Sequence, residues 1–163
     1  MMKQRCWELY QNLHKYKCYF ELYKNEAVRR DKIIRIIISF TSSASVAAWF
    51  IWDRLEIIWG IILIISSILH IIKPFLNYEK RILAVDYMLS DLKKILIDLN
   101  HFYESIQINN IADAEINDKM REIRQIYEDL ESKFRHTTAN SPQNSTLMNK
   151  AKENSKKELS ILP

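Results

Sequence analysis

The chain has 163 residues with one glycine and three prolines, which argues against strand-rich sandwiches and barrels and excludes glycine-based phosphate loops. Its two cysteines, Cys6 and Cys18, suit neither a disulfide framework nor a four-ligand zinc site. The net charge of +4 is uneven, because residues 1–32 hold eight Lys/Arg and four Asp/Glu whereas residues 77–136 hold nine and twelve. The two blocks are therefore expected to pack against each other rather than bind nucleic acid.

Residues 1–32 are predicted to form a cytoplasmic amphipathic helix. Apolar side chains recur there at alternating spacings of three and four residues, which is typical of a helical seam of the coiled-coil kind. The seam consists of Cys6, Leu9, Leu13, Tyr16, Phe20, Tyr23 and Ala27.

Residues 33–76 are predicted to form a transmembrane helical hairpin. The first span, 33–52, carries one charge, and as a helix it covers about 30 Å, the thickness of the hydrocarbon core. The turn DRLE precedes a second span, 57–76. Lys and Arg gather at the ends of the spans away from the turn, so both termini are expected in the cytoplasm and, in a bacterium, the protein in the inner membrane.

Residues 77–136 are predicted to form cytoplasmic helices with heptad seams. The seam fails around residues 109–113 and resumes at Ile116 in a new phase, which indicates two helices. Residues 137–163 lack an apolar period and are expected to be a flexible tail that could become partly helical on contact. The seam before the break is expected to join helices of one chain or to join chains in an oligomer. It consists of Ile82, Val85, Leu89, Leu92, Leu96, Leu99, Tyr103 and Ile106.

A polar layer occurs inside the apolar hairpin. A turn centred between Arg54 and Leu55 places serines of both spans level with one another, near the bilayer midplane. Two interpretations are open: small residues in contact between helices, or side chains that line a water-filled path in an oligomer. These predicted pore-lining or helix-contact residues are Ser39, Ser42, Ser43, Ser66, Ser67 and His70.

The sequence offers no pattern typical of an enzyme. His14, His101 and His136 are scattered without metal-ligand spacing, and the acidic residues 128–131 read as a solvated helix face. No Ser/His/Asp or Cys/His set lies on an arguable pocket. We therefore expect no catalytic residue, no metal ligand, no cofactor and no enzymatic activity.

The layout resembles that of the SLATT proteins, which are bacterial two-transmembrane effectors associated with nucleotide-signalling conflict systems. The resemblance covers residues 1–135 and rests on the basic N-terminal helix, the span KIIRIIISFTSSASVAAWFIW, a four-residue turn, the span IIWGIILIISSILHII and the long heptad helix from Ile82. It implies an effector that forms a pore or disrupts the membrane in antiphage defence. It also implies a nucleotidyltransferase or another sensor of a defence system as partner.

Two functions remain open at this point. One hairpin cannot enclose a pore, so the effector hypothesis requires a homo-oligomer in contact with membrane lipid, which we expect to self-associate through its seams. The alternative is a non-catalytic, membrane-anchored scaffold or regulator that recruits a partner through the same helical seams.

Overall fold

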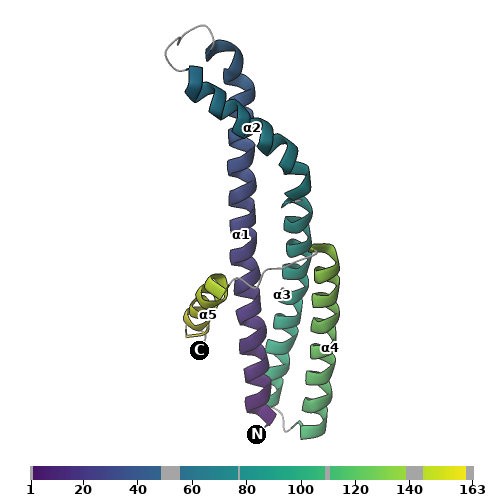
Figure 1. Ribbon diagram of the computed structural model, residues 1–163. Helices are drawn as coiled ribbons and strands as arrows, with labels where there is room; N and C mark the ends of the chain where they lie inside the picture. The colour runs from purple at the N-terminus through teal and green to yellow at the C-terminus, as the bar shows by residue number, and fades with distance from the viewer. Residues whose placement is uncertain (1, 49–55, 77, 109–110, 139–144, 161–163) are drawn as a thin grey trace. The chain divides into compact units, whose positions relative to one another are not determined.

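The computed structural model describes residues 2–48, 56–76, 78–108, 111–138 and 145–160. Within these residues the chain forms five α-helices and no strand, which confirms the all-α prediction for the described part (Figure 1). The helices are α1 (Met2–Ala48), α2 (Glu56–Leu76), α3 (Tyr78–Ile108), α4 (Asp113–Thr138) and α5 (Ser145–Leu159).

The chain divides into two units. The first, called the bundle unit, comprises Met1–Asn25 and Arg81–Pro163, and the second, called the hairpin unit, comprises Glu26–Lys80. The bundle unit therefore joins the beginning of α1 to most of α3 and to α4 and α5, which are distant from it in the sequence.

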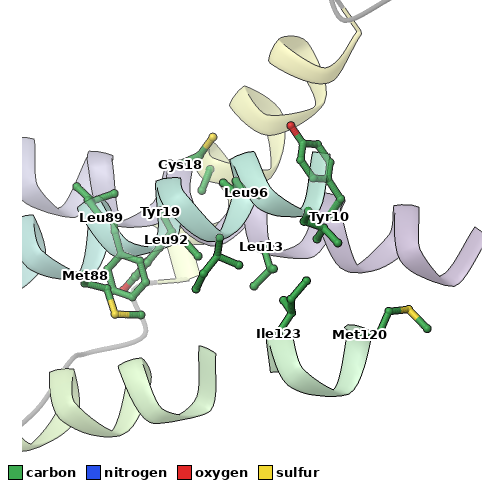
Figure 2. Packing of buried hydrophobic residues seen from close by; sticks show 14 of the residues in the cluster. Tyr10, Leu13, Cys18, Tyr19, Met88, Leu89, Leu92, Leu96, Met120 and Ile123 are labelled. Atoms are coloured by element: carbon green, nitrogen blue, oxygen red, sulfur yellow. The ribbon is translucent and has the colours of Figure 1, made fainter. Parts of the chain in front are cut away.

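The core of the bundle unit is built from the heptad positions. In α3 the side chains of Val85, Leu92, Leu99 and Ile106 are fully buried, and Leu89 and Leu96 are nearly so. Figure 2 shows Leu13 of α1, Leu92 of α3 and Ile123 of α4 turned toward one another. Ile82, the first residue of the seam, and Tyr103 are half-buried. The seam of α3 is thus occupied by helices of the same chain.

Aromatic ring pairs join α1 to α3 and to α4. Trp7 lies 5.3 Å from Tyr103 of α3, and Tyr16 lies 5.5 Å from Tyr127 of α4, measured between ring centroids. Offset and tilted ring pairs of this kind add about 0.5–1.5 kcal/mol beyond the area that they bury. The seam predicted for residues 1–32 therefore packs within the bundle unit from Cys6 to Tyr23, whereas its last member, Ala27, belongs to the hairpin unit.

Ion pairs join the N-terminal block to α3. Lys24 Nζ lies 2.6 Å from Asp86 Oδ1, and Lys93 Nζ lies 3.5 Å from Glu21 Oε1. All four side chains are partly exposed, so each pair contributes no more than about 1 kcal/mol. These pairs therefore add little to the stability of the fold.

The break between α3 and α4 falls where the seam changes phase. α3 ends at Ile108, and α4 begins at Asp113, with the Ile116 N–H donating to the Ala112 carbonyl at 3.2 Å in its first turn. Asp113 and Glu115 place negative charge at this helix start, which the helix dipole favours.

The C-terminal segment differs from the expected flexible tail. α4 continues to Thr138, and Ser145–Leu159 forms α5, where Ala151 is fully buried and Ser155 nearly so. The centre of the contact face of α5 consists of the small residues Ala151 and Ser155, which let two helices approach closely, and larger apolar side chains flank them. The face consists of Leu147, Met148, Ala151, Ser155 and Leu159.

The hairpin unit contains the remainder of α1 and all of α2. Among the described residues, no single helix has the length and apolarity to cross a membrane, whereas one bent pair, Gly60–Lys73 with Tyr78–Ile108, has both by length and composition. The expected turn and the last residues of the first span, 49–55, lie outside the described residues. The transmembrane hairpin therefore stays a prediction.

Candidate functional site

The outer face of α2 is an exposed apolar surface, here called the α2 apolar face. Its members recur at spacings of three and four residues, and no formal charge interrupts α2 from Ile57 to Ile72. The α2 apolar face comprises Ile57, Ile61, Ile64, Ile65, Ile68, Ile71, Ile72 and Phe75, which are between 41% and 80% exposed. Contiguous apolar surfaces of this extent mark interaction sites with protein or lipid.

The opposite side of α2 is half-buried and also mostly apolar. Ile62, Ser66 and Leu69 lie on it, again at helical spacing. α2 is therefore apolar around most of its circumference, a property of helices that are buried in a large core or in a membrane.

Two arginines of the hairpin unit, Arg30 and Arg35, are paired with acidic side chains. Arg35 Nε donates to Asp31 Oδ2 at 2.6 Å, and the same guanidinium contacts Glu79 in the first turn of α3. Arg30 pairs with Glu26 one helical turn away. The one charge predicted inside the first span is thus compensated by acidic groups from two helices.

The described part of the predicted polar layer lies on both helices of the hairpin unit. Ser39 and His70 are exposed, and Ser66 is half-buried. Ser67 is exposed and donates to the Leu63 carbonyl at 2.8 Å, the local bond by which a serine is satisfied inside an apolar helix.

Ser42 and Ser43 belong to α1, but their side chains lie outside the described residues. The match in depth between the serines of the two spans therefore stays a prediction.

A second group of polar side chains, here called the α1–α5 cluster, was missed by sequence reasoning. His14 and Cys18 of α1 meet Ser155 and Glu158 of α5. His14 Nδ1 is hydrogen-bonded to Ser155 Oγ at 3.0 Å, and His14 Nε2 lies 3.3 Å from Glu158 Oε2. The available signal was the spacing of His14 and Cys18, four residues apart on one helix face.

Burial and nearby charge set the protonation of the α1–α5 cluster. Burial, assisted by the Lys17 ammonium, lowers the pKa of His14. Burial and the Glu158 carboxylate raise the pKa of the Cys18 thiol to about 11. Lys17 Nζ donates to Glu158 Oε2 at 3.0 Å. At neutral pH the cluster therefore holds a neutral imidazole, a thiol and an ammonium–carboxylate pair.

A groove of about 550 Å³ lies beside the cluster, between α1 and α5. Ser155 forms part of its wall, and three lysines give it a positive potential. Its lining comprises Trp7, Gln11, Asn12, Lys15, Lys152, Ser155, Lys156, Leu159 and Ser160.

Comparison of the chain with protein-family models, with curated proteins and with solved structures finds no match.

Proposed function

We propose that this protein inserts its hairpin unit into a bacterial inner membrane, with both termini cytoplasmic, and assembles there into a pore or a membrane-disrupting oligomer. The single observation that carries this proposal is the α2 apolar face. With the layout shared with the SLATT proteins, it leads us to infer a defence effector that depolarises the membrane and arrests growth.

The energetic argument concerns the exposed isoleucines. Removing one such side chain from water is worth about 1.5–3 kcal/mol, and the α2 apolar face carries seven isoleucines and a phenylalanine. Transfer of this face from water into an apolar environment would therefore release free energy comparable to the stability of a whole domain. Lipid, or a second copy of the same helix, is the environment that suits it.

Contacts between chains are then expected in the hairpin unit. The seams, which the sequence suggested for self-association, are filled within the bundle unit, where Val85, Leu92 and Leu99 are fully buried. The hairpin unit instead offers small polar residues among large apolar ones, including Ser39, Ser66 and Ser67. Small residues of this kind allow close helix approach in membranes.

The same burial bears on the scaffold alternative. A partner recruited through the heptad seams would have to displace α1 or α4 from α3, and so open the core of the bundle unit. The pore hypothesis needs no such opening. A nucleotidyltransferase or another sensor would instead meet the outer surface of the bundle unit.

The test compares the membrane potential of cells that express different variants strongly, since a high chain concentration favours assembly by mass action. The native chain is expected to depolarise the membrane. Ser42→Leu combined with Ser67→Leu is expected to prevent depolarisation, and the mass of the detergent-solubilised particle distinguishes a lost assembly from a blocked path. Ser90→Leu, at an exposed serine of the bundle unit, is the matched control.

A native chain that leaves the membrane potential intact at strong expression would contradict the pore proposal. A double leucine variant that depolarises as well as the native chain would show that the hydroxyls do not line the path. A particle of one chain would exclude the oligomer.

A further inference from the structure

We propose that His14, Cys18 and Glu158 form a binding site for a divalent transition-metal ion such as Zn²⁺. The three side chains each offer one donor atom, and these atoms lie within 4.8 Å of one another. All three belong to the bundle unit, so the proposal is independent of whether the hairpin unit forms a pore.

The spacing of the donors suits a tetrahedral ion. Zn²⁺ bonds of about 2.0–2.3 Å place neighbouring ligand atoms roughly 3.3–3.7 Å apart. His14 Nε2 lies 3.3 Å from Glu158 Oε2, and Cys18 Sγ lies 4.0 Å from Glu158 Oε1. The Glu158 carboxylate therefore lies beside both the imidazole and the thiol, and rotation of the three side chains brings the donors closer around one ion.

The fold supplies the orientation that a metal site needs. His14 and Cys18 are four residues apart on α1, so their side chains project from the same face. Ser155 Oγ holds Nδ1 of the imidazole, and this leaves Nε2, which faces Glu158, as the nitrogen for the ion. A ligating histidine is usually oriented by an oxygen that accepts from its second ring nitrogen, and the Ser155 hydroxyl offers such an oxygen here.

The donor set indicates the class of ion. An imidazole with a thiolate selects Zn²⁺ and related first-row transition ions over Mg²⁺ and Ca²⁺. Binding replaces the S–H bond of Cys18 by a sulfur–metal bond and releases one proton to solvent. Three protein ligands leave the fourth position of a tetrahedral ion to water. The bound ion would also clamp α5 onto α1.

The positive charge of Lys17 opposes the binding of a metal cation at this site. Its ammonium lies 3.0 Å from Glu158 Oε2, the oxygen that also faces His14. The ion must take the other carboxylate oxygen or displace the ammonium. The affinity is therefore expected to be lower than that of a site free of positive charge.

The test is a titration of the full-length, reduced, metal-free chain in detergent with Co²⁺ alone, followed by competition with Zn²⁺. A thiolate-to-cobalt charge-transfer band that saturates at one Co²⁺ per chain and is displaced by Zn²⁺ is expected. Cys18→Ser should abolish the band. Cys6→Ser is the matched control and should retain it, because Cys6 is equally buried but lies outside the cluster.

Glu158→Gln is a second variant of the site that is expected to fold normally, because the Glu158 side chain is 46% exposed. This variant should bind Co²⁺ more than about tenfold more weakly, because even groups behind the ligands change metal affinity by about 10–100-fold. The absence of a charge-transfer band in the native chain, an unchanged band in Cys18→Ser, or native affinity in Glu158→Gln would each overturn the proposed site.

Discussion

Phe20 of α1 meets the edge of Phe134 of α4, with ring centroids 5.2 Å apart and ring planes at 75°. Both side chains are almost fully buried in the bundle core. Phe134→Ala is expected to lower the free energy of unfolding by about 3–5 kcal/mol, through lost burial and the cavity that remains. Denaturant titration of the chain in detergent measures this loss. Arg135→Ala, at an exposed neighbour, should change stability by less than about 0.5 kcal/mol.

Ile64 of α2 and Ile97 of α3 are similarly exposed, at 62% and 57%, but only Ile64 belongs to the α2 apolar face. Ile64→Lys is expected to reduce membrane integration, because a lysine at the centre of a membrane helix costs about 2.5–3.5 kcal/mol for insertion. Alkaline extraction of membranes measures the integrated fraction. Ile97→Lys should leave it unchanged. Equal behaviour of the two variants would count against a membrane role for α2.

Docking of α5 should be visible in the reactivity of Cys18. The thiolate is the species that an alkylating reagent attacks, and burial with a raised pKa keeps the Cys18 thiol unreactive. Ala151→Glu puts a charge into the fully buried contact of α5 and should release that helix, so that Cys18 is alkylated much faster.

The matched control is Lys152→Glu, which makes the same residue at an exposed neighbour. It should leave Cys18 protected. Cys6, which lies in the bundle core, should stay slow in both variants, and mass spectrometry of the peptides distinguishes the two thiols. Fast alkylation of Cys18 in the native chain would show that α5 does not cover it.

Lys17→Met tests the electrostatics of the proposed metal site. Removing the ammonium beside Glu158 should tighten Co²⁺ binding, because a positive charge next to a divalent ion opposes its binding. The titration used for the site measures the change. Lys15→Met, which removes a lysine that takes no part in the cluster contacts, should have a smaller effect. Weaker binding in Lys17→Met would mean that the lysine supports the site.

The sequence was sufficient where large apolar residues repeat. The spacing of Leu92, Leu96 and Leu99 predicted the buried face of α3, and the change of phase near residues 109–113 predicted where α3 ends. Such patterns arise because one face of each helix is buried, and the apolar residues of that face recur at helical spacing within a short stretch of sequence.

The sequence was insufficient where a contact depends on small residues or distant partners. The buried centre of the α5 contact face is Ala151 with Ser155, and such small residues do not stand out in a pattern of large apolar repeats. His14 and Glu158 are in contact although most of the chain separates them in the sequence. A single sequence does not show which distant residues are in contact in the fold. Ser42 and Ser43 of the predicted polar layer lie outside the described side chains, so the layer stays a prediction.

The separation of 141 residues between His14 and Ser155 has a consequence for biosynthesis. At about 5–20 residues per second, roughly 7–30 s pass between synthesis of the first and of the second. During that interval the His14 and Cys18 face of α1 has no α5 to cover it. Stalled nascent chains that end before α5 should therefore show Cys18 open to alkylation, and chains that extend beyond α5 should not.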